Sequence, residues 1–292
     1  MFNRFASLFG AHHLAGAGLV LGGASSFVSK KAHCSGGGEH VIEDHIPTLH
    51  YGWPHDNALS SFDHKSIRRG FQVYRQVCAS CHSVNKIAFR NLVGVTHTEA
   101  DMKKIAESYE VEDGPNDIGE MFERPGKLSD KIPSPYKNEQ QARSANNGAL
   151  PPDLSLMVKS RHAGIDYIFS LLTGYVEPPA GKTILPGLHY NPYFPGGAIA
   201  MGKQLTDGQV EYEDGTPSTE TQMAKDVACF LAWTSEPEHD ERKKSGAQFI
   251  AAIFAAIVIT GFYKRFRWSL LKSRKITYAP GNAAGPKGSG HH

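Results

Sequence analysis

Two cysteines and a histidine within five consecutive residues constrain this chain more than any other feature. The motif Cys78-Ala79-Ser80-Cys81-His82 has the C-x-x-C-H form of covalent c-type haem attachment. On a helix, Cys78 and Cys81 are three positions apart and His82 is four from Cys78, so all three share one face. Two thioether bonds can then hold a porphyrin while His82 binds its iron. The motif predicts a fold built around one covalent haem c.

Two other chemistries use a C-x-x-C spacing. A thioredoxin-type dithiol occurs in a βαβ context, and the pattern typical of strands is thin here. A structural zinc site needs a further pair of Cys or His ligands, and the remaining cysteines, Cys34 and Cys229, each stand alone. Cys229 lies in an apolar helical stripe, which indicates a buried thiol. Haem attachment is therefore the favoured interpretation.

The sixth coordination position of a haem iron needs a second ligand or stays open. A Met thioether raises the reduction potential, whereas a second His leaves it lower. Met201 follows a Pro- and Gly-rich loop, which can bring backbone close to a flat cofactor. Met157 and Met223 lie in predicted helices, where methionine more often fills the core. The residues alone leave several candidates open: Met102, Met121, Met157, Met201, Met223, His162 and His189.

The formal net charge of +2 conceals three regions of different sign. Residues 1–34 hold three bases and no acid, and residues 242–292 hold ten bases and no acid. The body, 35–241, therefore carries 18 bases against all 29 acids. An acidic body disfavours nucleic-acid binding, because phosphate contacts require an excess of Lys and Arg. It favours basic partners, cations or simple solubility.

The first 38 residues have the pattern of a cleaved targeting presequence. The start of the chain is free of acids, and 14–24 is an apolar run too short to span a bilayer. Such a leader fits an organelle transit peptide followed by a sorting signal. A bacterial export signal is one alternative. The other is that the segment is an ordinary first helix of the fold and no targeting signal.

A second apolar run, 247–263, contains no charge and predicts a membrane anchor over 242–268. Its 17 residues reach roughly 26 Å as a helix, at the short end of what spans a bilayer. Aromatic residues and six Lys or Arg follow directly, and the positive-inside rule places that end on the cytoplasmic or matrix side. Three further bases, Arg242, Lys243 and Lys244, precede the run, so the charge difference that indicates the orientation is smaller. The tail, 269–292, is basic.

The body, 39–241, is predicted to be mainly α with long loops. Apolar residues at helical spacing indicate helices over 61–79 and 219–234. A helix over 153–161 follows two prolines, and one over 166–173 is stopped by Gly174. Frequent Pro and Gly clusters between these segments indicate ordered loops.

Beyond the haem motif, several segments resemble the cytochrome c1 family. The match runs in order from about residue 52 to residue 280 and includes the anchor, whereas a generic cytochrome c would share only the haem motif. The resembling segments are 78–82, 146–155, 191–196, 214–217, 224–227, 236–240 and 268–275.

The resemblance implies a specific set of site residues. Cys78 and Cys81 would attach the haem, and His82 and Met201 would be its axial ligands. Asn146, Pro152 and Tyr167 would line the haem pocket, with Arg161 near a propionate. For Arg161, a solvated charge at a helix end is the simpler alternative.

The resemblance also implies a one-electron carrier rather than an enzyme on its own. It would be a subunit of ubiquinol–cytochrome c reductase, a dimeric multisubunit complex containing cytochrome b. Its donor would be the Rieske iron–sulfur protein and its acceptor soluble cytochrome c. The haem domain would lie in the intermembrane space, the anchor in the mitochondrial inner membrane and the C-terminus in the matrix.

Acidic residues suited to recruiting a basic carrier form three clusters. They are Glu107, Glu110, Glu112, Asp113 and Asp117; Glu211, Glu213 and Asp214; and Glu236, Glu238, Asp240 and Glu241. Plain solvated loops are the alternative for each. Two rival functions stay open from the residues alone: a haem enzyme with an open iron site, such as a peroxidase, and a structural or sensing haem protein with two His ligands.

Overall fold

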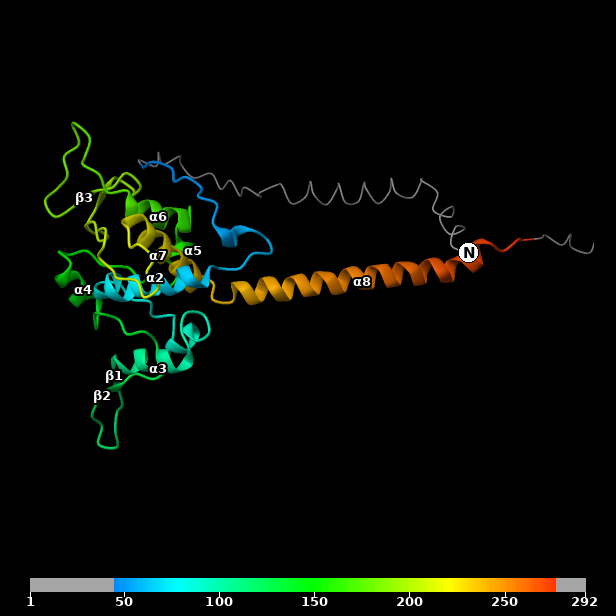
Figure 1. The fold of residues 1–292 in the computed structure, drawn as a ribbon, viewed down its shortest axis with the longest axis horizontal. Coiled ribbons are helices and arrows are strands. Elements are labelled where there is room, and N and C mark those ends of the chain that lie inside the picture. The colour runs from blue at the N-terminus through cyan, green and yellow to red at the C-terminus, as the bar shows by residue number, and fades with distance from the viewer. Residues whose placement is uncertain (1–44, 277–292) are drawn as a thin grey trace, which may run out of the picture. The chain divides into compact units, whose positions relative to one another are not determined.

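The computed structural model describes residues 45–276 of the 292-residue chain. The predicted presequence, Cys34 and the end of the basic tail lie outside this range. The described chain is mainly α-helical, as expected, with a few short strands (Figure 1). The α-helices are α2 (His64–Gln76), α3 (Glu99–Glu107), α4 (Glu139–Ala145), α5 (Met157–Ser160), α6 (Ile165–Thr173), α7 (Glu220–Ser235) and α8 (His239–Lys272). The 3₁₀ turns are η1 (Pro54–Asp56), η2 (Cys78–Ser80) and η3 (Phe89–Leu92).

The strands form two small antiparallel pairs. β1 (Glu110–Asp113) pairs with β2 (Phe122–Pro125), and β3 (His189–Tyr190) pairs with β4 (Ala198–Ile199). In the first pair, Arg124 of β2 contacts the carboxylates of both Asp113 and Asp130. These ion pairs hold the β1–β2 hairpin to the turn that follows it.

Helix α2 carries the chain into the cysteine motif. Its N-cap, Asp63, accepts hydrogen bonds from the backbone amides of Lys65 (3.0 Å) and Ser66 (3.3 Å), which satisfies two otherwise unpaired donors. The expected helix over 61–79 is too long at both ends. The chain tightens after Gln76 into η2, so the motif lies on a 3₁₀ turn rather than on the α-helix itself.

Helix α7 packs against α2 and forms the centre of the core. It is buried nearly all round, including Met223, Phe230 and Cys229. The closest approach is at Gly70 of α2, where a Cβ atom would lie 2.0 Å from the carbonyl oxygen of Asp226. Only glycine permits this crossing, because any side chain would push the two helices apart.

A buried polar network fixes the same crossing. The Asp226 side chain is fully buried and accepts hydrogen bonds from Ser66 Oγ (2.6 Å) and from Arg69 Nε (2.8 Å). Gln222 donates a third bond, at 2.9 Å. A buried carboxylate is tolerated because charged and polar donors satisfy it, and breaking such a pair is costly. The network therefore locks the haem-motif helix onto α7.

The expected helix over 166–173 is confirmed as α6, and the one over 219–234 as α7. The expected helix over 153–161 is wrong over its first half: only α5, Met157–Ser160, is α-helical. Asp153 instead turns its carboxylate to Ser83 Oγ and the amide of Asn85, both at 2.8 Å. Its other carboxylate oxygen accepts from the Ser155 amide at 3.0 Å, and such local side-chain bonds to backbone compete with helix formation.

Helix α8 continues from the core into the apolar run. It has 34 residues and, by length and composition, is a candidate membrane span; its apolar stretch is not buried against the described chain. Its first turns are tied to the N-terminal segment. Lys243 Nζ donates to the carbonyls of His55 (2.6 Å), Asn57 (2.7 Å) and Ser60 (3.1 Å), and Asp240 accepts from the amide of Phe62 (3.1 Å). The predicted boundary at 241/242 falls inside α8.

Candidate functional site

The cysteine motif forms one tight turn. The amides of Cys81 and His82 both donate to the carbonyl of Cys78, at 3.1 and 2.9 Å. The second of these bonds has the i to i+4 reach of an α-helix, so the expected shared face survives the change to a 3₁₀ turn. Both thiols are free and half-buried. The three side chains thus leave the backbone within a single turn.

A hydrogen bond to a distant carbonyl orients the imidazole of His82. Its Nδ1 lies 2.8 Å from the carbonyl oxygen of Pro152. A carbonyl only accepts, so Nδ1 carries the proton and the lone pair is on Nε2. Burial lowers the pKa of His82, although the Pro152 carbonyl opposes this shift. The ring is therefore neutral near pH 7, as an iron ligand must be.

Asp153 positions part of the candidate site, although no motif in the sequence indicates such a role for it. Its carboxylate binds the Ser83 hydroxyl and the Asn85 amide, and the Leu154 amide donates to the Ser83 carbonyl at 2.8 Å. Although burial opposes it, these hydrogen bonds and those from Ser155 lower the pKa of Asp153. The bonds hold the 152–155 segment beside the segment that follows His82, and so set the position of the Pro152 carbonyl. A carboxylate directly after two adjacent prolines was the available signal in the sequence.

A second group of predicted site residues gathers around α6. Tyr175 donates its hydroxyl hydrogen to the carbonyl of Met201 at 3.0 Å. Burial raises the pKa of Tyr175, and the nearby Tyr167 adds to this. Burial likewise raises the pKa of Tyr167, against the effect of Arg161 beside it. Arg161 is itself exposed. The structure thus brings Arg161, Tyr167 and Met201 into one neighbourhood.

Asn146 belongs to neither group. Its amide donates to the Tyr136 hydroxyl (3.0 Å) and to the carbonyl of Ala142 (2.7 Å), which closes the turn after α4. Asn147 has a φ of 52° in this turn, and Gly148 follows at 86°. Within residues 45–276, the hydrogen bonds of Asn146 therefore indicate a role in shaping the loop.

The other methionine candidates are separated by burial. Met102, Met157 and Met223 lie in the core, as expected of core methionines, whereas Met121 is 55% exposed in the loop before β2. Met201 is half-buried, and it lies just after β4 ends at Ile199. His189 lies close by: a Cβ on Gly202 would be 3.2 Å from its Nε2. Met201 and His189 therefore remain the two candidates of the same loop region.

The two rival uses of the cysteine motif find no support in the described chain. Burial raises the pKa of the Cys78 thiol to about 12, with Cys81 adding to this. A redox dithiol needs the opposite shift, because the thiolate is the reactive form. Between residues 45 and 276, no group of three or more His, Cys, Asp or Glu residues is arranged to hold a metal ion. Cys229 is buried as expected, and burial raises its pKa to about 11.

These residues fit a c-type haem. Two free thiols stand on one turn, and a neutral imidazole presents its Nε2 because Nδ1 is engaged by Pro152. A hydrogen bond from the unliganded nitrogen to a carbonyl is what fixes a metal-binding histidine in its tautomer and orientation.

The three acidic clusters differ in how far their charges are paired. Glu213 and Asp214 form ion pairs with Arg68 and Arg69, at 2.7 and 2.9 Å. Glu236 contacts both Lys159 (2.8 Å) and Arg242. In the cluster near β1, three carboxylates have no ion pair among the described residues: Glu107, Glu110 and Asp117. In the other two clusters, Glu211, Glu238 and Glu241 also have none within residues 45–276.

Comparison with known proteins identifies the family. A sequence model of the Cytochrome C1 family matches residues 53–271. A potato protein named "Cytochrome c1-2, heme protein, mitochondrial" is 62% identical over 226 residues, covering 77% of this chain and 87% of the relative. A Kluyveromyces lactis protein named "Cytochrome c1, heme protein, mitochondrial" is 55% identical over 269 residues, 91% of each chain. A Candida albicans protein named "Cytochrome b-c1 complex catalytic subunit, mitochondrial" is 60% identical over 231 residues, covering 79% and 80%.

The described residues form a mainly helical domain with a haem-attachment motif, followed by one candidate membrane helix. This fold and site define the class of cytochromes with a membrane-anchored haem domain. The matches are specific within that class. The chain belongs to the cytochrome c1 family. The resemblance inferred from the motifs is confirmed, and the expectation of a mitochondrial protein is supported by every relative described above.

Proposed function

We propose that this protein is the haem-bearing electron carrier of a mitochondrial ubiquinol–cytochrome c reductase. The observation that carries the proposal is the imidazole of His82, oriented by the Pro152 carbonyl, beside two free thiols on the same turn. A bound haem supplies the one-electron redox couple. Cys78 and Cys81 would hold it covalently, His82 would bind the iron through Nε2, and Met201 would be the second axial ligand.

The chain's own residues orient the site and tune it. Asp153 and Pro152 hold the imidazole, while Tyr175 anchors the backbone at Met201. A methionine ligand favours a higher reduction potential than a second histidine would. Pro152, Tyr167 and Asn146 would line the pocket, with Arg161 placed to meet a propionate.

The names of the relatives support a place in a multisubunit mitochondrial complex. One of them is named as the catalytic subunit of a cytochrome b-c1 complex. We infer a multisubunit dimeric complex with cytochrome b, in which the Rieske iron–sulfur protein donates the electron and soluble cytochrome c accepts it. The chain would be a carrier subunit of that oxidoreductase and no enzyme by itself.

The proposed topology places the haem domain, 39–241, in the intermembrane space. The anchor, 242–268, would cross the inner membrane and the basic tail, 269–292, would lie in the matrix. The presequence, 1–38, would be removed. Basic residues that follow the apolar run of α8 support this direction.

An optical spectrum with and without carbon monoxide tests the function. We expect a methionine-ligated haem that does not bind carbon monoxide. Met201→Leu should open the iron to carbon monoxide and lower the potential, whereas the exposed Met121→Leu should change neither. A five-coordinate iron in the unmodified protein would indicate a haem enzyme instead. A two-histidine spectrum that His189→Ala abolishes would indicate a structural or sensing haem protein.

A further inference from the structure

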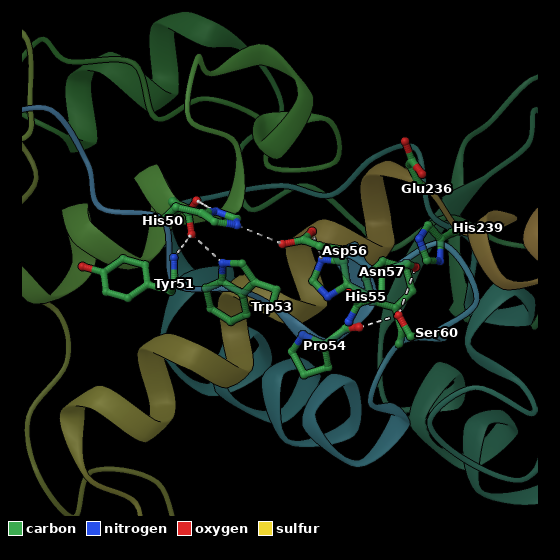
Figure 2. Close-up of polar contacts among 12 residues, drawn as sticks. His50, Tyr51, Trp53, Pro54, His55, Asp56, Asn57, Ser60, Glu236 and His239 are labelled. Atoms are coloured by element: carbon green, nitrogen blue, oxygen red, sulfur yellow. Dashed lines mark hydrogen bonds and ion pairs between the residues drawn. The ribbon is translucent and has the colours of Figure 1, made fainter. Parts of the chain in front are cut away.

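The carboxylate of Asp166, on α6, binds a segment near the start of the described chain to that helix. Asp166 is buried and accepts three hydrogen bonds: from His50 Nδ1 (2.9 Å), the Tyr51 amide (3.2 Å) and Trp53 Nε1 (2.6 Å). Figure 2 shows the side chains of His50 and Trp53 and the backbone of Tyr51 with these bonds. All three donors come from residues 50–53, more than 110 positions away. We call residues 50–53 the strap.

Aromatic packing extends the contact along the same face of α6. Phe169 lies edge-on to Tyr51, with ring centroids 4.8 Å apart, and to Trp53, at 6.0 Å. The Tyr51 hydroxyl is 3.3 Å from Ser170 Oγ. Asp166, Phe169 and Ser170 are three and four positions apart, so they form one stripe on the helix. The strap covers that stripe.

The C-terminal end of α6 and the two residues after it contact the segment that ends at Met201. The carbonyl of Leu171 accepts a hydrogen bond from Asn191 Nδ2 at 2.8 Å. Gly174, directly after the helix, lies so close to Tyr193 that a Cβ would be 2.5 Å from that ring. The next residue, Tyr175, holds the Met201 carbonyl. The loop of the proposed iron ligand is therefore held at three points, one in the last turn of α6 and two in the residues that directly follow it.

Helix α6 is poorly fixed by its own ends. It has nine residues, and its N-cap, Gly164, provides no side-chain cap. A helix this short is marginal in isolation, so its position depends on tertiary contacts. Helix α6 packs against α7, and its Ile165 and Ile168 are buried in the core. The strap holds the side on which Asp166 lies.

We propose that Asp166 is a positioning residue for the sixth haem ligand. By binding the strap to α6, it fixes the position of the helix whose C-terminal end contacts the Met201 loop. The inference rests on the proposed role of Met201. It assigns Asp166 no contact with haem, substrate or partner. Its effect is transmitted through α6 to Leu171, Gly174 and Tyr175.

Three variants of the full-length holoprotein test this. Asp166→Asn keeps the shape of the side chain and removes its charge. Trp53→Phe removes one hydrogen bond to Asp166 and retains the aromatic contact with Phe169. This milder variant still tests the proposal if Asp166→Asn does not fold. Asp240→Asn is the matched control, because that carboxylate binds the backbone amide of Phe62, outside the strap, and fastens it to α8.

The readouts are the haem reduction potential, carbon monoxide binding and hydrogen exchange of residues 191–201. We expect Asp166→Asn to lower the potential, to admit carbon monoxide in part of the population, and to speed exchange in the loop about tenfold. Trp53→Phe should shift all three in the same direction by less. Asp240→Asn should lower stability and leave all three unchanged.

Loss of stability in Asp166→Asn with an unchanged potential and unchanged loop exchange would overturn the proposal. The same holds if Asp240→Asn shifts the potential equally. Failure of the proposed ligand is distinguishable: if Met201→Leu leaves the spectrum unchanged, Met201 is not the ligand. Loop exchange in Asp166→Asn still decides whether Asp166 positions the loop.

Discussion

His82 Nδ1 lies 2.8 Å from the carbonyl oxygen of Pro152, which is 70 positions further along the chain. This one contact determines which ring nitrogen is available to a metal. Because Nδ1 must donate to the carbonyl, only Nε2 remains as a ligand.

Replacement of His82 should remove an iron ligand without preventing attachment. In His82→Gly we expect covalent haem to be retained through Cys78 and Cys81, with an altered spectrum and a lost methionine-ligated signature. Added imidazole should restore a six-coordinate spectrum, because it supplies the missing nitrogen. Haem-stained electrophoresis and titration with imidazole measure both effects. A wild-type spectrum in His82→Gly would rule out His82 as the ligand.

The glycine at the α2–α7 crossing should be intolerant of any side chain. In Gly70→Ala the new Cβ meets the Asp226 carbonyl at 2.0 Å, so the helices must separate. We expect a loss of about 3 kcal/mol, which lowers Tm by roughly 6–12 °C in a domain of this size. Gly246→Ala in α8 is the control, since no atom lies within 4 Å of its Cβ position. Equal melting temperatures for the two variants would contradict the tight crossing.

His55 and His50 should change the free energy of unfolding in opposite directions as the pH falls. Burial lowers the pKa of His55, despite the nearby Asp56, so its folded form resists protonation. Stability is therefore lost as pH falls below the unfolded value of about 6.5, by at most about 1.4 kcal/mol per pH unit for this one proton. The hydrogen bond to Asp166 raises the pKa of His50, so its contribution is present below that value and disappears as pH rises through its folded pKa.

The measurement is the free energy of unfolding between pH 8 and pH 5. His55→Phe, which retains the ring contact with Phe62, should flatten the loss in acid. His50→Ala should make that loss steeper. Identical pH profiles for the two variants would show that these histidines do not govern acid stability.

The proposed electron transfer to cytochrome c should become slower as ionic strength rises. The unpaired carboxylates of the cluster near β1 create a stronger negative electrostatic potential than Glu213 and Asp214. The charges of those two residues are neutralised by Arg68 and Arg69. We expect Glu107→Gln with Glu110→Gln to lower the low-salt rate more than Glu213→Gln with Asp214→Asn. Stopped-flow reduction of cytochrome c over a salt series measures this. A rate independent of salt would argue against steering.

The point of truncation should decide whether a stable soluble domain results. A chain ending at Ser245 retains Asp240 and Lys243, which bind Phe62 and the carbonyls of 55–60. We expect it to be soluble with an unchanged haem spectrum. A chain ending at Glu238 loses both ties and should melt at a lower temperature. Loss of haem from the longer chain would mean that the anchor is part of the haem domain.

Local pattern predicted α6 and α7 to within about one residue, because apolar spacing and a following Gly174 mark their extent. It overextended the helix at the cysteine motif, because the tightening after Gln76 depends on packing. Two helices, α3 and α4, were not anticipated. Their N-caps, Thr98 and Asn138, accept bonds from the amides three positions on, and this capping signal was present in the sequence.

Contiguous features were readable from the sequence by itself. The haem motif, the apolar anchor and the family resemblance each depend on residues close together in the chain or matched in order along it. The tertiary structure alone decided which distant groups meet: Pro152 with His82, Asp226 with Gly70, and Asp166 with the strap. The physical reason is that such contacts depend on the path of the chain through the core. No local spacing encodes that path.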